Sequence, residues 1–267
     1  MLFFKSMKRL NLLFLLIAIQ SHAQKNEQVS TWRNQILNDT TLYKREFKDS
    51  LISKNFSSLW THTDNGSVYG FIGDGFQRIQ IKIISAEKDT GSGDTYNIYG
   101  KSKVKNNICE FHGTIKITNI RIFKHEHWGA DDEFKNNGIK KQGLLLANYY
   151  FIEDLGCSHS GIFEGVLSSN WYLDKHDHIK YDDIELQCSD GFRNNQFVGT
   201  WNANDSSQTK TCNWGDYRIP FSDKLDCGVG EFYPANEFIK MGWATPNDVQ
   251  VSPNQIVRQE DTEQWWK

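Results

Sequence analysis

Proline is scarce in this sequence and unevenly placed. All 4 proline residues lie in Pro220–Pro253, so a long stretch of the chain contains none. Because proline removes a donor from a strand ladder, such a stretch is typical of a continuous antiparallel meander. With 20 glycine and 4 proline residues among 267, low-complexity and collagen-like chains are excluded. The composition, 38% hydrophobic and 24% charged, also excludes a disordered chain and a multi-span membrane protein.

Long clusters of lysine and arginine are also missing. The formal charge is −3, and removal of segment 1–23, with its three basic and no acidic residues, would lower it to −6. Lys101, Lys103 and Lys105 alternate along one segment, which is the pattern of a solvated strand face. Nucleic-acid binding needs a concentrated positive surface, so nucleic acid is not an expected partner.

The first 23 residues contain an apolar run with the features of a signal peptide. Lys5, Lys8 and Arg9 precede the run Leu10–Ile19, and Ser21-His22-Ala23 places small residues where a signal peptidase reads them. A run of about ten residues is too short to span a bilayer, which takes about 20. Residues 1–23 therefore predict a cleaved signal peptide, with an uncleaved N-terminal anchor as the alternative. We expect a secreted or periplasmic protein with no membrane span after cleavage.

Five cysteines follow this segment, so at least one is free or pairs between chains. Export would allow disulfides to persist. Cys212 and Cys227 enclose 14 residues in the irregular C-terminal part. A loop of that size would add about 3 kcal/mol by the chain-entropy relation, and we predict this disulfide. Cys109 and Cys188 lie on apolar faces of expected strands, which favours buried free thiols, and the pairing of these two and Cys157 stays open.

Residues 30–60 carry the only helical pattern. Apolar residues from Trp32 to Leu59 recur at spacings of three to five, with no glycine or proline among them. The polar stretch Asn38-Asp39-Thr40 interrupts the pattern, which favours two short helices over one long helix. We expect residues 24–66 to form a helical segment packed on a sheet.

Beyond this segment the apolar period changes to two. Residues 78–83 alternate isoleucine with polar residues, and residues 111–118 repeat the alternation. This pattern predicts strands with one buried and one wet face. The apolar phase then slips by one residue, to Ile120 and Ile122, as a β-bulge near Asn119 would produce.

Short polar turns such as Asn65-Gly66 and Asn106-Asn107 separate these runs, and links of this length join antiparallel neighbours only. We therefore predict an all-β, mainly antiparallel fold: a meander of about ten strands that forms a barrel-like or sandwich sheet, with a short helical N-terminal segment. Residues 67–255 would form a single β domain with an irregular C-terminal wrap. Residues 256–267 are charged, end in Trp265-Trp266-Lys267, and are expected to form a disordered tail.

Two short motifs indicate close packing in such a sheet. Phe111–Ile115 and Phe163–Leu167 both read Phe-x-Gly-x-aliphatic, and the glycine would let a neighbouring chain or side chain approach closely. Gly199-Thr200-Trp201 resembles the Gly-x-Trp of lipocalins. Lipocalins carry it on the first barrel strand, whereas here it lies about three-quarters along the chain. The resemblance favours a barrel-like sheet and assigns no lipocalin site.

Few residues are arranged as a catalytic or metal-binding site would require. His125-Glu126-His127 and His176-Asp177-His178 could each place two imidazoles on one side of a strand, where they could share a metal ion. Both pairs lie at expected strand ends or turns, where histidine is commonly just solvated, so no metal or cofactor is assigned. Nucleophile-elbow, phosphate-loop, dinucleotide and HExxH motifs are missing. No catalytic residue is assigned, and an enzyme is not the favoured interpretation.

Five of the 9 tryptophan residues lie in the C-terminal third. Exposed tryptophan and tyrosine rings bind sugar rings or apolar ligands by stacking and area burial. Asn213–Arg218 is the best loop candidate, since its Trp214 and Tyr217 have glycine and polar neighbours. With Trp171 and Trp201, these two residues form the predicted ligand-binding set. A tryptophan in such a loop is either folded back into the core or kept at the surface for binding.

Three functional hypotheses follow. The leading one is an exported non-catalytic β domain that binds a small ligand or glycan through an aromatic-lined mouth or groove. The first alternative is a protein-interaction or inhibitor-type envelope protein that uses the same aromatic residues. The second is a metal-dependent hydrolase built on His125 and His127. A deep cavity would favour the first hypothesis, a flat apolar patch the second and converging imidazoles the third.

Overall fold

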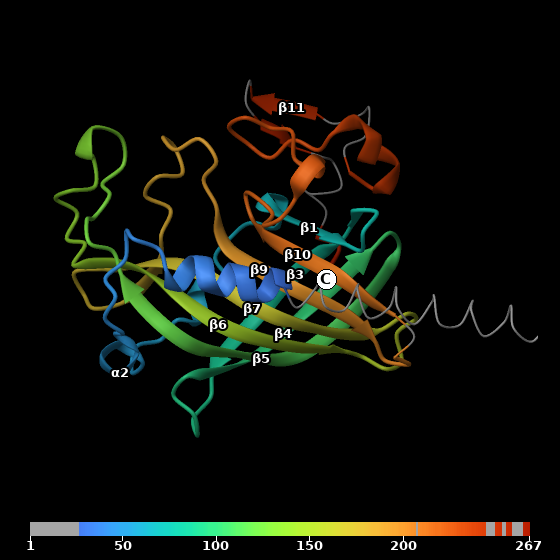
Figure 1. Cartoon of the computed structure of the whole chain (residues 1–267), viewed down its shortest axis with the longest axis horizontal. Coiled ribbons are helices and arrows are strands. Elements are labelled where there is room, and N and C mark those ends of the chain that lie inside the picture. Colours follow the sequence, from blue (N-terminus) through green and yellow to red (C-terminus); the bar gives the residue numbers. More distant parts are fainter. Residues whose placement is uncertain (1–26, 207, 244–248, 253–254, 258–263) are drawn as a thin grey trace, which may run out of the picture.

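The computed structural model describes residues 27–206, 208–243, 249–252, 255–257 and 264–267. The predicted signal peptide, residues 1–23, lies outside this part of the chain, and so do residues 258–263 of the predicted tail. The described part consists mainly of a ten-stranded sheet curled into a half-barrel (Figure 1). None of the described helices is long and apolar enough to cross a bilayer.

Neighbouring strands of this sheet all pair antiparallel, in the order β2-β1-β10-β9-β7-β6-β5-β4-β3, with β8 beside β7. The strands are β1 (Val68–Ile72), β2 (Gln77–Arg78), β3 (Gln80–Lys88), β4 (Thr95–Val104), β5 (Asn107–Ile122), β6 (Lys141–Glu153), β7 (Gly161–Leu173), β8 (Ile179–Tyr181), β9 (Asn194–Ala203) and β10 (Thr209–Asp216). A separate hairpin pairs β11 (Val249–Ser252) with β12 (Gln255–Val257). The predicted all-β antiparallel fold of about ten strands is confirmed.

Strand β5 shows how the sequence pattern sets the curvature. Its pairing with β6 shifts register between Ile117 and Asn119, where the slipped apolar phase predicted a bulge. Because a bulge adds one residue to one strand, Ile115 and Ile117 before it and Ile120 after it all face the core and are fully buried. A bulge also bends its strand and increases the local twist, which helps the sheet to curl.

The two edges of the sheet approach each other at one end of the half-barrel. β2 and β3 stand at opposite ends of the strand order, yet only Ile79 separates them along the chain. The backbone N–H of Ile79 donates to the carbonyl of Gly70 in β1 at 3.0 Å. Glycine is required here, because a Cβ atom at residue 70 would lie 2.7 Å from Cβ of Trp214. The sheet therefore returns toward itself at this end.

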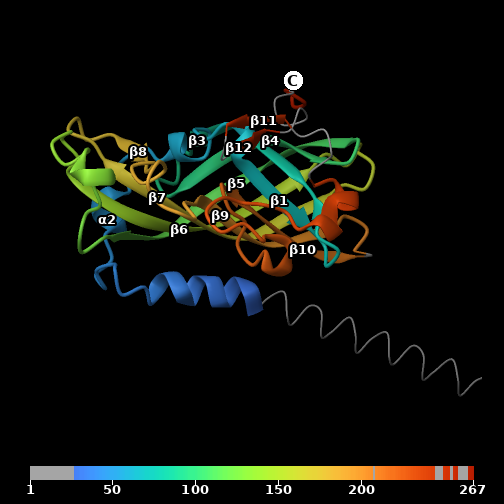
Figure 2. The same cartoon turned by 90° about the horizontal axis from the view of Figure 1, so that it is seen from above.

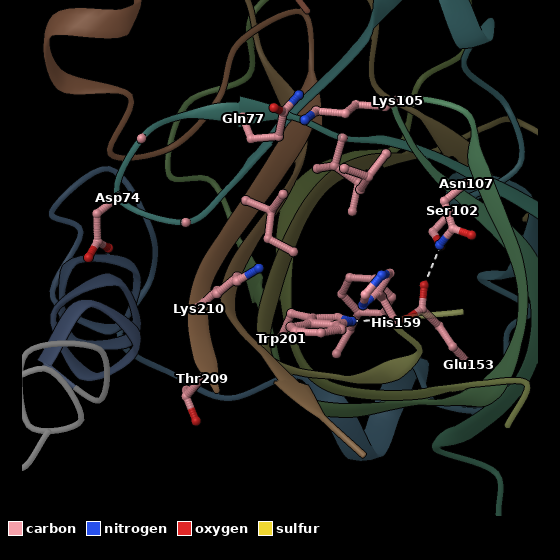
Figure 3. Close-up of a pocket in the computed structure, with 16 residues that line it drawn as sticks. Asp74, Gln77, Ser102, Lys105, Asn107, Glu153, His159, Trp201, Thr209 and Lys210 are labelled. Atoms are coloured by element: carbon pink, nitrogen blue, oxygen red, sulfur yellow. Dashed lines mark hydrogen bonds between the residues drawn. The ribbon is translucent and has the colours of Figure 1, made fainter. Parts of the chain in front are cut away.

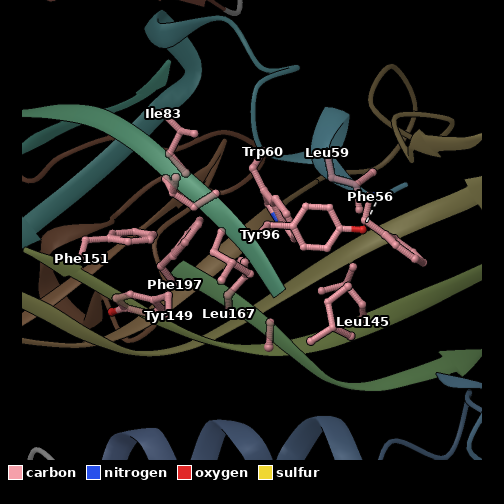
Figure 4. Close-up of a cluster of buried hydrophobic side chains, with 14 of the residues drawn as sticks. Phe56, Leu59, Trp60, Ile83, Tyr96, Leu145, Tyr149, Phe151, Leu167 and Phe197 are labelled. Atoms are coloured by element: carbon pink, nitrogen blue, oxygen red, sulfur yellow. Dashed lines mark hydrogen bonds between the residues drawn. The ribbon is translucent and has the colours of Figure 1, made fainter. Parts of the chain in front are cut away.

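Aromatic rings fill the middle of the half-barrel (Figure 4). The rings of Phe197 and Trp214 stack with centroids 4.4 Å apart, and Tyr149 meets Trp214 edge-on at 5.2 Å. Gly165 and Gly199 lie opposite each other in β7 and β9, and a Cβ atom at Gly199 would lie 2.3 Å from the Tyr149 hydroxyl. These glycines make room for the tyrosine, which confirms the predicted packing role of Gly165 in its Phe-x-Gly-x-aliphatic motif.

The N-terminal helix, residues 27–37, lies along the outer face of the sheet (Figure 2). Trp32 Nε1 donates to Ser168 Oγ at 3.3 Å, and the guanidinium of Arg33 donates to Asn148 Oδ1 at 2.6 Å. The shorter helical turns are α2 (Lys48–Leu51), η1 (Ser57–Leu59), η2 (Asn65–Ser67), η3 (Ala130–Asp132), η4 (Asp223–Leu225) and η5 (Asn236–Met241). The predicted helical segment thus divides between the outside and the inside of the half-barrel.

Residues 55–67, here called the plug, fill the end of the half-barrel away from Ile79. Phe56 and Leu59 are fully buried there, and Trp60 meets Tyr96 of β4 edge-on with centroids 5.0 Å apart (Figure 4). The Tyr96 hydroxyl accepts the backbone N–H of Phe56 at 3.0 Å. The plug therefore supplies apolar side chains where the strands alone leave the interior open.

A buried carboxyl group, that of Asp216 at the end of β10, ties the plug to the sheet. Its Oδ2 accepts hydrogen bonds from Thr63 Oγ1 at 2.6 Å, from Asn195 Nδ2 at 2.7 Å and from the Tyr181 hydroxyl at 2.9 Å. Asn195 Nδ2 also donates to the carbonyl of Leu59 at 2.8 Å. Burial raises the pKa of Asp216 to about 7, although the three donors act in the opposite direction.

The chain after β10 wraps one outer side of the sheet in short, irregular turns. A second apolar cluster forms there from Phe71, Ile219, Leu225, Phe232, Phe238 and Trp243. The chain end also reaches the sheet, where the ring of Trp266 lies 5.1 Å from the Lys82 ammonium and that of Trp265 lies 5.9 Å from the Lys103 ammonium. These contacts place the last residues against the outer side of β3 and β4.

Asp216 predicts a pH dependence of folding stability. Its pKa is raised from 3.8 to about 7 in the folded state, so the folded protein holds the proton more tightly than the unfolded chain does. The stabilisation from this group is full below pH about 4 and is lost as the pH rises through about 7. Over that range the free energy of unfolding should fall by up to about 1.4 kcal/mol per pH unit because of this group.

Urea unfolding of the wild type and of Asp216→Asn between pH 5 and pH 8 measures this contribution. Asparagine keeps an oxygen acceptor for the three donors and cannot ionise, so the variant should lack this part of the slope. Asp74→Asn, at an exposed position, controls for the loss of one carboxylate. Equal slopes for the wild type and Asp216→Asn would contradict the role given to this carboxyl.

Candidate functional site

A cavity of about 770 Å³ opens at the end of the half-barrel opposite the plug (Figure 3). Its apolar wall comes from Ile72, Ile79, Val104, Phe163 and Trp201. Its polar and charged lining residues are Asp74, Gln77, Ser102, Lys105, Asn107, Glu153, His159, Thr209 and Lys210. A hollow of this size with an apolar wall and a few polar groups has the character of a small-molecule site.

Glu153 is the buried acid of this cavity. It ends β6 on the same face as Tyr149. Its Oε1 accepts the Ser102 hydroxyl, and its Oε2 accepts the Gly161 N–H at 2.8 Å and Trp201 Nε1 at 2.9 Å. Burial raises the pKa of Glu153, and the three donors act in the opposite direction. Because these groups belong to β4, β7 and β9, the carboxyl joins three other strands at the cavity wall.

Trp201 is held in one orientation by contacts on several sides. Besides its bond to Glu153, the Lys210 ammonium lies 5.3 Å from the centroid of its ring, a cation–π contact. A Cβ atom at Gly161 would lie 2.4 Å from Cε2 of this indole, so glycine is required beside it. The side chain is 6% exposed. Trp201 therefore forms a fixed part of the cavity wall.

Two loops form the rim of the cavity: residues 105–106 between β4 and β5, and residues 154–160 between β6 and β7. A disulfide joins Cys109 to Cys157, with their Cα atoms 5.7 Å apart. Nearby, Asn107 Nδ2 donates to the carbonyl of Ser158 at 2.7 Å. The disulfide therefore fixes the two rim loops relative to each other.

The predicted disulfide between Cys212 and Cys227 is wrong, because both residues are free. Strand alternation turns Cys212 of β10 into the core, where it is fully buried, whereas Cys227 is exposed in the C-terminal wrap. Of the cysteines whose pairing stayed open, Cys109 and Cys157 form the disulfide and Cys188 is free and exposed. The expected buried free thiols at Cys109 and Cys188 are therefore also wrong.

Of the four predicted ligand-binding aromatic residues, only Trp201 lines the cavity. Trp171 and Trp214 are 0% and 2% exposed and belong to the core. Trp214 lies within β10 rather than in a loop, so the expected exposed loop ring is wrong. Tyr217 follows β10, and its ring meets Phe192 edge-on at 5.1 Å, away from the cavity lining.

The expected strand at His125 and His127 does not form. Residues 124–127 follow β5 without strand structure, and the two histidines line one small hollow beside Thr40 and Phe123. His127 Nε2 lies 3.0 Å from Asp182 Oδ2. Burial disfavours the charged imidazolium, but the hydrogen bond and charge of Asp182 outweigh it and raise the pKa of His127. Within the described ranges, no three His, Cys, Asp or Glu side chains gather as metal ligands would.

Sequence reasoning missed Glu153, Lys105 and Lys210 as lining residues. For Glu153 the sequence contains a signal. Tyr149, Phe151 and Glu153 are spaced by two residues, so their side chains lie on the same inward face of the strand and the acid is placed in the core. Acidic residues are rarely buried without partners, so such a residue marks an internal hydrogen-bonding site. For the two lysines no comparable signal exists, since their meeting at one cavity depends on which strands become neighbours.

Comparisons of the chain with protein-family models, with curated proteins and with solved structures found no match. The interpretation of the site therefore depends on its geometry.

Removal of the Cys109–Cys157 disulfide should destabilise the protein. The bridge spans 48 residues of sequence, and the chain-entropy relation gives about 4 kcal/mol for a loop of that length. We expect the double variant Cys109→Ser/Cys157→Ser to lose about that much free energy of unfolding in urea. The matched double variant Cys188→Ser/Cys227→Ser removes two exposed free thiols and should unfold like the wild type. An equal loss in both variants, or none in the first, would count against this disulfide.

Proposed function

We propose that this protein is an exported, non-catalytic binding protein that holds a small molecule with an apolar body in the cavity of its half-barrel. The volume of about 770 Å³ lies within the usual range for ligand pockets, about 300–1,000 Å³. The polar groups converge from several strands, as expected for groups that orient a ligand. Glu153 has a structural role in the wall, because its carboxyl oxygens already accept hydrogen bonds from three protein donors.

The observation that carries this proposal is the difference between the two ends of the half-barrel. At one end the plug inserts Phe56 and Leu59, which are both fully buried. At the other end the apolar wall of Val104, Phe163 and Trp201 faces a hollow. Apolar surface left facing water forfeits about 25 cal/mol for each Å² that a ligand could bury. An apolar molecule that fills the hollow would recover this free energy.

The cavity favours a small molecule over a glycan. Glycans stack on tryptophan and tyrosine faces that lie open to solvent. Trp201 is the one tryptophan or tyrosine among the cavity-lining residues of the described chain, and it is only 6% exposed. Three of the five apolar lining residues, Ile72, Ile79 and Val104, are aliphatic, which suits a hydrocarbon or aromatic ligand better.

A protein-interaction role is the second candidate, because the outer face carries exposed apolar side chains. Ile108, Tyr150 and Ile152 are 43%, 42% and 43% exposed on β5 and β6. Exposed apolar side chains of this kind are typical of a contact surface. A metal-dependent hydrolase is not favoured, since His127 bonds to Asp182.

Export is part of the proposal and has two supports. The Cys109–Cys157 disulfide is of the kind that persists in oxidising compartments. The basic and apolar pattern of residues 1–23 is that of a secretory signal. A secreted or periplasmic location accounts for both.

The test is a fluorescence titration with N-phenyl-1-naphthylamine, an uncharged aromatic probe that brightens in apolar sites. The wild type should bind it saturably at one site. Val104→Trp would fill the cavity from β4 and should weaken binding at least about tenfold, in the range of interface anchors. The matched control Ile108→Trp adds the same ring on the outer side of the same hairpin and should bind like the wild type. Absence of binding, or equal binding by Val104→Trp, would refute the cavity as the site.

A further inference from the structure

Two lysine side chains, Lys105 and Lys210, stand at the mouth of the cavity. Lys105 lies in the turn between β4 and β5, and Lys210 lies near the start of β10, on the other side of the opening. Figure 3 shows the Lys210 ammonium directed toward the hollow and the Lys105 side chain lying along the rim toward Gln77, whereas the carboxylate of Asp74 points away from the hollow. Two lysines from different parts of the chain therefore line one entrance.

Neither ammonium group forms an ion pair with a carboxylate in the part of the chain that the structure describes. Lys210 instead lies against the ring of Trp201, with 5.3 Å between its ammonium and the ring centroid. Other lysines of the sheet are paired, for example Lys101, which lies 3.0 Å from Glu110. An anion could therefore approach the mouth without displacing a carboxylate.

The acid within the cavity is already engaged by the protein. Both carboxyl oxygens of Glu153 accept hydrogen bonds, on Oε1 from Ser102 and on Oε2 from Gly161 and Trp201. The two lysines at the mouth are therefore not paired with this carboxyl group, although the whole protein is acidic, with a formal charge of −3.

We infer that the ligand is an amphiphile with one anionic group, a carboxylate, sulfonate or phosphate. Its acid group would lie between Lys105 and Lys210 at the mouth, and its apolar body would contact Val104, Phe163 and Trp201 inside. This inference rests on the proposed binding function. It assigns the specificity of the site to the two lysines and the bulk of the affinity to the apolar wall.

The experiment compares two probes that share one skeleton. N-phenyl-1-naphthylamine is uncharged, and 8-anilino-1-naphthalenesulfonate is the same molecule with a sulfonate added. The wild type should bind the sulfonate about five- to tenfold more tightly, as expected for two partly exposed charge pairs. Added salt should reduce this ratio, because it screens exposed charges.

The double variant Lys105→Gln/Lys210→Gln should bring the ratio of the two dissociation constants close to one. The matched control Lys116→Gln/Lys180→Gln removes two exposed lysines from the outer side of the sheet and should keep the wild-type ratio. A wild-type ratio near one, or a ratio unchanged in Lys105→Gln/Lys210→Gln, would overturn the inference while leaving the binding function intact. Failure of the wild type to bind either probe would instead overturn the proposed function, and the inference with it.

Discussion

One oxygen atom, Oδ2 of Asp216, joins the plug to the sheet, and the filling of that end of the half-barrel depends on this connection. It receives three hydrogen bonds, from the plug through Thr63 and from the sheet through Asn195 and Tyr181. The interior of a curled sheet must be filled. An empty interior would leave apolar side chains without packing contacts and buried polar groups without hydrogen-bond partners, and both raise the free energy of the folded state. The plug fills the interior at one end, and the Asp216 carboxyl fixes it there. The unfilled space is thereby confined to the opposite end.

A second buried carboxyl group, that of Glu153, connects strands at the open end, where a cavity remains. It bonds to Ser102, Gly161 and Trp201 and so fixes the wall of the cavity, but no segment of the described chain enters the hollow there. Each of these buried acids is satisfied by three donors, which is what allows an acid to stay inside a protein. The aromatic cluster around Trp214 separates the two ends. The half-barrel is therefore filled by the plug at one end and contains the cavity at the other.

Local patterns were enough to predict most of the strands, and non-local pairing accounts for what was missed. The alternation of residues 111–118 and its slip near Asn119 predicted both the strand and its bulge, because side-chain alternation follows directly from backbone geometry. Residues 213–216 are polar and contain a glycine, so they resemble a loop. They lie instead in β10 with both faces covered, and Asn213 there accepts the Gly199 N–H at 3.0 Å and donates to the Pro220 carbonyl at 3.2 Å. The cysteine pairing failed for the same reason, since the order of strands decides which cysteines meet.

The measurement that tests the account most directly is the NMR signal of the Trp201 indole N–H during titration with N-phenyl-1-naphthylamine. This group donates to Glu153 at the cavity wall, so a bound probe must change its surroundings, whereas Trp171 and Trp214 are sealed in the core. The account predicts that the Trp201 indole resonance, assigned with Trp201→Phe, shifts with the probe while the resonances of Trp171 and Trp214 stay in place. A Trp201 resonance that remains fixed at saturation, with shifts confined to the outer face around Tyr150, would contradict it.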